Sequence, residues 1–176
     1  MLADLSPLIA ATTEWLTRAY PSSGGALAHA LCEAQARQAV TVAAWLRYPT
    51  ATDAALVGLT GPGGSARLDR ISGAADSAAD VDADDSAWRS WVDEVVASWA
   101  ACLLTDPSLA AGAVAGLTGG DHTRVTPPDF RRLIAPDVRD RQAAVLLRHP
   151  DLIAPVAALH HPQLLARLGR GQALIA

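Results

Sequence analysis

The chain has 176 residues, which is enough for one compact domain with its own apolar core, so folding needs no disulfide or structural metal. Apolar residues make up 51% of the chain, aromatic residues only 5%, and the net charge at pH 7 is −4. This balance argues against a nucleic-acid-binding domain, which normally carries a basic excess. All 14 basic residues are arginine, a bias that indicates a GC-rich bacterial genome rather than selection for anion binding.

The first residues, MLADLSPLIAATTEW, have neither a basic start nor a cleavage-site pattern, so they do not predict a signal peptide. The most apolar long stretch, residues 27–46, is interrupted by His29 and Glu33 and does not predict a membrane span. We therefore predict a cytosolic protein that does not insert into a membrane. Cys32 and Cys102 are then expected to be buried free thiols, and the sequence leaves open whether they lie close together.

Several helix starts are marked by a capping residue followed by proline in the first turn. Ser6 precedes Pro7 and Asp106 precedes Pro107, which places a side-chain oxygen where the first backbone N–H groups need an acceptor. Thr126 begins a similar signal, with an acidic residue three positions later. Together with the apolar spacing, these signals predict helices over residues 7–20, 24–47, 53–59, 87–104, 107–117, 127–134, 136–148, 150–160 and 162–169.

The predicted fold is all-α, a compact multi-helix domain of about nine helices. For residues 55–71 a small hairpin or an irregular insert is the alternative. Within one structural domain we distinguish N-terminal helices over 1–59, a Gly/Pro-rich and then acidic linker over 60–86, and a C-terminal helical cluster over 87–176.

The long predicted helix 24–47 carries a polar stripe. His29, Glu33 and Arg37 recur at intervals of four residues, so they lie in line on one face of the helix. A carboxylate-bridged di-iron site needs Glu-x-x-His on two helices, whereas the order here is reversed and occurs once. We interpret the stripe as a polar face, and most other positions of the helix are small and apolar, which predicts a central helix.

The tryptophan-rich segment 87–104 is expected to pack against this central helix. Its apolar residues recur at helical spacing, which predicts that Trp99 lies in the core while Trp88 or Trp91 stays partly exposed. A partly exposed tryptophan is typical of a surface that binds another protein, so Trp88 and Trp91 are candidate binding residues.

The acidic segment 76–85 is rich in Ala, Asp and Ser and predicts a solvated linker. Asp80, Asp82 and Asp84 resemble the first half of a calcium-binding loop. The positions that then require Gly and Glu are Asp85 and Trp91, so we predict no calcium site.

Three of the five histidines lie close together near the C-terminus, in the stretch that contains HPDL and HPQL. His149, His160 and His161 are spaced by eleven residues and by one, whereas zinc ligands on a helix are typically separated by three to five. Because His149 and His161 each precede a proline, we interpret both as markers of helix starts and predict no metal and no cofactor.

Arg131, Arg132 and Arg139 lie on the adjacent predicted helices 127–134 and 136–148, an arrangement that resembles a helix-turn-helix in outline. Acidic residues interleave with them, which argues against DNA binding. We therefore take the three arginines, together with the tryptophans above, as candidate residues for binding a protein.

No motif in the chain indicates catalysis: a nucleophile elbow and a phosphate-binding loop are both missing from the sequence. This favours a non-catalytic protein–protein interaction or assembly protein, an adaptor of a bacterial cytosol, with another protein as its partner and an oligomeric state that the sequence does not define. One alternative is a helical ligand-binding or regulatory domain. Another is a metalloprotein or enzyme that uses His29 and Glu33 or the C-terminal histidines.

A family resemblance adds a further alternative. An irregular N-terminal half followed by the run FRRLIAPDVRDRQAAVLL, residues 130–147, is similar to small accessory proteins of bacterial type III secretion sorting platforms. The likeness extends over a minor part of the chain and includes no specific motif. It implies an accessory protein that assembles with other components of a secretion machine.

Overall fold

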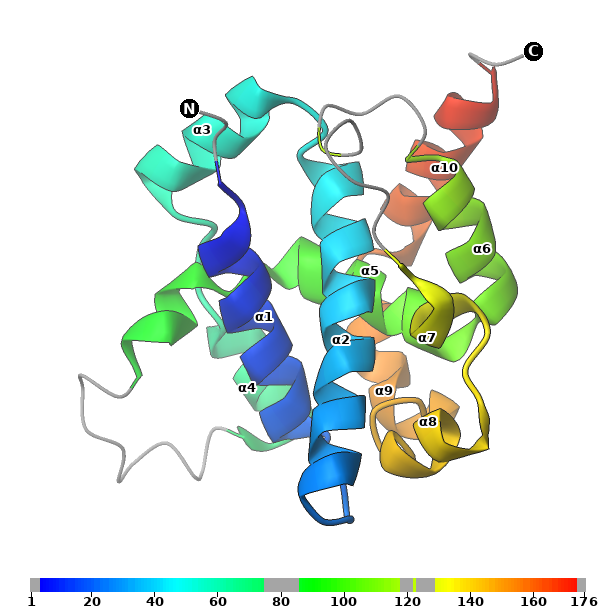
Figure 1. Ribbon diagram of the computed structural model, residues 1–176. Coiled ribbons are helices and arrows are strands. Elements are labelled where there is room, and N and C mark those ends of the chain that lie inside the picture. Colours follow the sequence, from blue (N-terminus) through cyan, green and yellow to red (C-terminus); the bar gives the residue numbers. More distant parts are fainter. Residues whose placement is uncertain (1–3, 75–85, 118–121, 123–128, 174–176) are drawn as a thin grey trace.

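The computed structural model describes residues 4–74, 86–117, 122 and 129–173 of the chain. Within these residues it contains ten α-helices, one 3-10 helix and no strand, which confirms the predicted all-α fold. In chain order the elements are α1 (Ser6–Ala19), α2 (Ala26–Arg47), α3 (Ala51–Thr60), α4 (Ala66–Ser72), the 3-10 helix η2 (Ala87–Trp91), α5 (Glu94–Thr105), α6 (Pro107–Ala115), α7 (Arg131–Ile134), α8 (Val138–Ala143), α9 (Pro150–Ala157) and α10 (His161–Ala173) (Figure 1).

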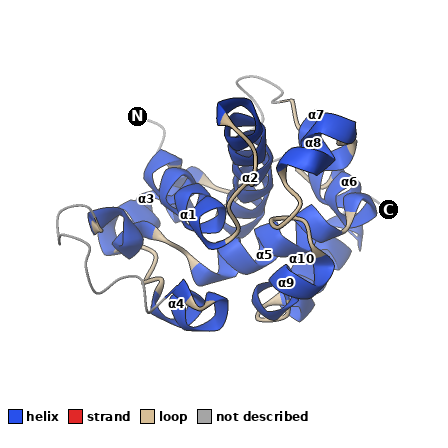
Figure 2. Ribbon diagram, turned by 90° about the horizontal axis from the view of Figure 1, so that it is seen from below, coloured by secondary structure: helices blue, strands red, loops and turns tan. Residues whose placement is uncertain are grey.

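Helices α2 and α5 cross at the centre of the molecule (Figures 1 and 2). Helix α1 packs beside α2, and α6, α9 and α10 pack around α5. Every residue of α5 from Val96 to Leu104 is buried, as expected for a helix that is apolar on all sides. Both helices carry fully buried alanines, whose small side chains allow neighbouring helix axes to approach closely. They are Ala36, Ala39, Ala43 and Ala44 on α2, and Ala97, Ala100 and Ala101 on α5.

The alternative of a hairpin over residues 55–71 is wrong. The two ends of this stretch belong to helices α3 and α4, which are joined by the glycine-rich turn after Thr60. The buried side chains of α3 are Ala54 and Val57, three residues apart, which is the spacing of a helix face and not of a strand. Helix α4 ends at Gly73, whose φ of 73° is in the left-handed region that glycine adopts at little cost.

The predicted single helix 87–104 is interrupted at Val92 and Asp93. Both residues have extended backbones, with ψ of 127° and 116°, and they separate η2 from α5. The carboxylate of Asp93 accepts the N–H of Val96 at 3.0 Å, so it caps α5. An aspartate satisfies more backbone N–H groups at a helix start than inside a helix, which explains the break.

Most remaining predicted boundaries agree with the structure to within four residues. The exceptions are 127–134, where α7 has only four residues, and 136–148, where α8 has only six. Helix α4 was not among the predicted helices. Residues 76–85 and Thr126 lie outside the described residues, so the predicted linker and the predicted threonine cap of helix 127–134 stay predictions. The three-part division of the chain also stays a prediction. A single apolar cluster extends from Leu5 to Leu164.

Trp99 is 3% exposed and belongs to the apolar core, as predicted. Its indole N–H donates to the backbone oxygen of His160 at 3.1 Å. Trp88 and Trp91 are both half-buried and pack against the same core. The prediction that one of these two tryptophans stays partly exposed is therefore met by both.

Candidate functional site

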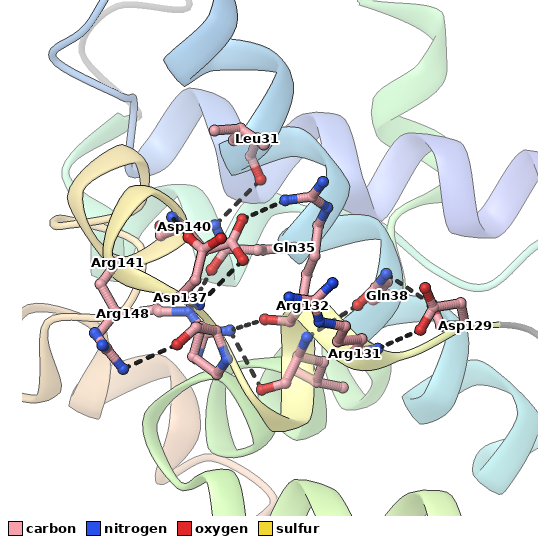
Figure 3. Close-up of polar contacts among 12 residues, drawn as sticks. Leu31, Gln35, Gln38, Asp129, Arg131, Arg132, Asp137, Asp140, Arg141 and Arg148 are labelled. Carbon is pink, nitrogen blue, oxygen red and sulfur yellow. Dashed lines mark hydrogen bonds and ion pairs between the residues drawn. The ribbon is translucent and has the colours of Figure 1, made fainter.

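Two glutamines on α2 hold the segment of α7 and α8 against the core (Figure 3). Gln38 spans the start of α7: its amide nitrogen donates to the carbonyl of Asp129 at 2.8 Å, and its oxygen accepts the N–H of Leu133 at 2.9 Å. Gln35, three residues earlier and completely buried, donates to the carbonyl of Asp140 at 2.8 Å. Because residues three apart lie on one helix face, α2 presents both amides to the same neighbour.

Arg148 connects three helices through one guanidinium group. Its Nε donates to Oε1 of Gln35 at 2.6 Å, one Nη donates to the carbonyl of Leu104 at 2.9 Å, and the other donates to the carbonyl of Arg132 at 2.8 Å. These acceptors lie on α2, α5 and α7. Burial lowers the pKa of Arg148, and the nearby Asp140 carboxylate opposes that effect. The arginine stays charged, and its planar guanidinium group links α2, α5 and α7 by hydrogen bonds.

Asp140 is the acidic member of this network and is 3% exposed. One of its oxygens pairs with Nη1 of Arg132 at 2.5 Å, and the other accepts the N–H of Asp137 at 3.2 Å. The Asp137 carboxylate in turn accepts the N–H of Asp140 at 2.8 Å, which completes a capping box at the start of α8. The hydrogen bond from the Asp140 N–H lowers the pKa of Asp137.

The exposed side chains of residues 131–146 are mostly apolar or basic, and Asp137 is the exposed acid among them. Val138 is 60% exposed and Val145 is 52% exposed, and Ile134 and Leu146 are also open to solvent. We call this surface the α7–α8 face. Its apolar members are Ile134, Val138, Val145 and Leu146, and its basic members are Arg131, Arg139 and Arg141.

The predicted binding arginines differ in their surroundings. Arg132 points inward to Asp140, so its charge is matched. Arg131 and Arg139 are exposed, and no carboxylate among the described residues lies within ion-pair distance of either. The α7–α8 face therefore offers two unpaired positive charges beside apolar side chains.

The other predicted binding residues, Trp88 and Trp91, lie far along the chain from this face. The guanidinium groups of Arg18 and Arg89 both lie over the Trp88 ring, each 5.2 Å from the ring centroid. Arg89 also pairs with Asp69 at 2.6 Å, and the other oxygen of that carboxylate accepts the indole N–H of Trp15 at 2.8 Å. Trp88 is thus part of a packed junction between α1, α4 and η2, and its binding role stays a prediction.

The polar stripe lies on α2 as expected. Arg37 pairs with Glu33 at 3.0 Å, and His29 is exposed one turn earlier. Within the described part of the chain, no three His, Cys, Asp or Glu side chains come together in a way that could hold a metal ion. The stripe and the C-terminal histidines do not meet.

The partners of His160 are what the sequence interpretation missed. Its Nε2 lies 2.8 Å from Oε1 of Glu94, and the same carboxylate oxygen accepts Nη1 of Arg67 at 3.1 Å. The N–H of His160 donates to Oγ of Ser98 at 3.0 Å. These contacts connect the turn before α10 to α5 and α4, and no local pattern could have revealed partners 66 and 27 residues apart.

The two cysteines are buried and free. Burial raises the pKa of Cys32 to about 11 and that of Cys102 to about 11, so both thiols stay protonated at neutral pH. Since the thiolate is the nucleophile, neither residue is activated for chemistry.

Comparison of the chain with protein-family models, curated proteins and solved structures gives no match. No single helix in the described ranges is long and apolar enough to cross a membrane. Helices α5 and α6 reach that length only together, and they are bent by 120° at their junction.

Proposed function

We propose that this chain is a non-catalytic helical protein–protein interaction or assembly protein, and that the α7–α8 face is its contact surface. The observation that supports this most is the contrast between the two sides of that segment. Its inner side is held by a network of charged and amide groups around Arg148, while its outer side leaves apolar side chains and unpaired arginines open to solvent.

A contact surface of this kind benefits from being rigid before the partner arrives. Side chains that are already fixed lose less conformational freedom on binding, so more of the interaction energy remains as affinity. Arginine and aliphatic side chains together also suit an interface, because the apolar groups supply the buried area and the charges supply specificity.

We further propose that the protein acts in a bacterial cytosol. Two unpaired, buried thiols are typical of a reducing compartment. Assembly with components of a secretion machine, which the sequence likeness of residues 130–147 implies, would be one instance of this function.

Site-specific photo-crosslinking tests the proposal. A photoreactive amino acid at Val145 should yield a defined cross-linked protein in cells of the source organism. The matched control is Leu165 on α10, which is exposed to a similar degree (48% against 52%) but lies outside the face. Equal labelling from both positions, or none from Val145, would contradict the proposal.

A further inference from the structure

The α7–α8 face lies at the edge of the molecule, and its apolar side chains point away from the core (Figures 1 and 2). The residues that α8 and the turn after it bury recur at intervals of three and four, as on one side of a helix. They are Asp140, Ala143, Ala144 and Leu147. Val138, Val145 and Leu146 fall on the other side and are exposed, so the core does not use their apolar surface.

The charges on this outward side are unequal. Arg131, Arg139 and Arg141 are exposed, whereas Asp137 is the exposed acid among residues 131–146. Three arginines against one aspartate leave an excess of two positive charges at the face itself. The Asp137 carboxylate caps α8, so it is already engaged with the backbone of its own helix.

The excess positive charge is not matched within the described part of the chain. None of the ion pairs found there includes Arg131, Arg139 or Arg141. Arg141 donates to the backbone carbonyl of Pro136 at 2.9 Å, which fixes its position but leaves its charge unmatched. Guanidinium groups form their strongest contacts with carboxylates and phosphates, so the face is suited to an anionic partner.

The composition of the face distinguishes between the anionic partners that this chemistry allows. A protein that follows a nucleic-acid backbone typically contacts about six or more phosphates, and the face offers three arginines beside an acid. Polybasic sites for anionic membranes contain about four to eight Lys or Arg. Membrane-facing surfaces also favour Trp and Tyr, whereas the apolar members of the face are all aliphatic. A protein segment with carboxylates and apolar side chains fits this composition best.

From these observations we infer that the partner of the α7–α8 face is an acidic amphipathic helix of another protein. Its apolar side chains cover Val138, Val145 and Leu146, and its carboxylates pair with Arg131 and Arg139. The described residues contain no strand, so the partner cannot bind by adding a strand to a sheet edge, whereas a helix supplies apolar anchors at intervals of three and four residues. The inference rests on the proposed function and gives the partner its chemistry.

Selection from a displayed library of random peptides tests the inference. The natural chain is one bait, and the variant Val145→Asp is the other. Val145 is exposed, so the variant is expected to keep the circular dichroism of the natural chain. Peptides that the natural chain selects and Val145→Asp does not should be enriched in Asp and Glu. Their apolar residues should recur at intervals of three and four.

A peptide selected in this way then measures the role of charge through its fluorescence anisotropy. Arg139→Glu replaces attraction by repulsion and should weaken binding by about fivefold or more. The matched control is Arg70→Glu, an exposed arginine on α4 outside the face, which should change affinity by less than about twofold. Added salt should weaken binding to the natural chain, because it screens the charges at the rim of the contact.

The other outcomes separate failure of this inference from failure of the proposed function. Basic or uncharged peptides that depend on Val145 would overturn the acidic helix and leave the interaction function standing. Peptides that bind Val145→Asp equally well would contradict the face itself, and with it the proposed function. Binding to phosphatidylserine vesicles, or self-association of the pure chain, that only the natural chain shows and Val145→Asp loses would assign the face to a membrane or to a second copy and overturn the inference.

Discussion

The α2–α5 crossing and the α7–α8 segment are stabilised in opposite ways. At the crossing, alanines and a fully buried α5 exclude water, and side-chain polar groups take little part. At α7–α8, short helices of four and six residues are held by the side chains of Gln35, Gln38 and Arg148. Short helices are not stable alone, so their position depends on individual hydrogen bonds. Apolar packing supports the fold, and a polar network supports the surface that we propose binds a partner.

The largest effect is expected from Trp99→Ala. The side chain is buried in the core, and its indole N–H donates to the carbonyl of His160. Removing it leaves a large cavity, while the carbonyl of His160 still accepts the N–H groups of Gln163 and Leu164, so the free energy of unfolding should fall by about 3–5 kcal/mol. Urea unfolding measures this. A loss below about 1 kcal/mol would mean that the crossing does not depend on this side chain.

Arg148→Met should be the next most damaging change. It leaves the acceptors on Gln35, Leu104 and Arg132 without their donor in a partly buried place. Orphaned buried polar groups cost ~1–3 kcal/mol each, and relaxation recovers part of this, so we expect a loss of about 2–4 kcal/mol. The control is Arg139→Met, an exposed arginine of the same segment, which should change stability by less than about 0.5 kcal/mol.

Asp106→Ala removes the N-cap of α6, a helix that belongs neither to the α2–α5 crossing nor to the α7–α8 segment. Its carboxylate accepts the N–H groups of Ser108 and Leu109 at 2.9 and 3.0 Å. Losing the cap of α6 should cost about 1 kcal/mol. The hydrogen bonds from Leu109 and from the Ser108 side chain lower the pKa of Asp106 below its ordinary value of 3.8.

This pKa shift gives the cap a pH dependence. Because the folded-state pKa is below the unfolded one, the stabilisation is complete above about pH 4 and is lost as the pH falls through the folded value. Unfolding curves between pH 2 and 6 should therefore converge for the natural chain and Asp106→Ala at the acid end. Curves that stay equally far apart at all pH values would exclude a charged cap.

The smallest effect is expected from the double change His149→Ser and His161→Ser. His149 occupies the N-cap of α9 without a side-chain cap bond, and α10 begins at His161, so neither ring is needed for the helix start. Serine caps well, so stability should stay within about 1 kcal/mol of the natural chain. Elemental analysis should find the same metal content in both proteins. Stoichiometric zinc that only the natural chain retains would support the metalloprotein alternative.

Local features of the fold could be predicted from the sequence, whereas long-range contacts could not. Proline and cap signals at Pro7, Asp106 and Pro150 are local, and the helices they predict are present. The predicted cap at Ser6 is wrong, because α1 begins at Ser6 and its N-cap, Leu5, makes no side-chain cap bond. The polar network was not predictable, because Gln35 and Arg148 are 113 residues apart and each looks like an ordinary surface residue of an amphipathic helix. Similar local sequence also misleads: in the two Pro-x-Leu segments near the C-terminus, Leu152 is 47% exposed and Leu164 is fully buried.

Native-state amide hydrogen exchange can distinguish apolar packing at the α2–α5 crossing from the polar network that holds α7 and α8. In Arg148→Met, the N–H groups of Leu133, Ala135 and Arg141 should lose more protection than the N–H of Ala97 in α5, because the segment then opens without global unfolding. In Trp99→Ala, all four N–H groups should lose protection together. If Arg148→Met instead lowers protection equally in α5 and in α7–α8, the α7–α8 segment is part of the core's cooperative unit, and the polar network does not hold the proposed contact face separately.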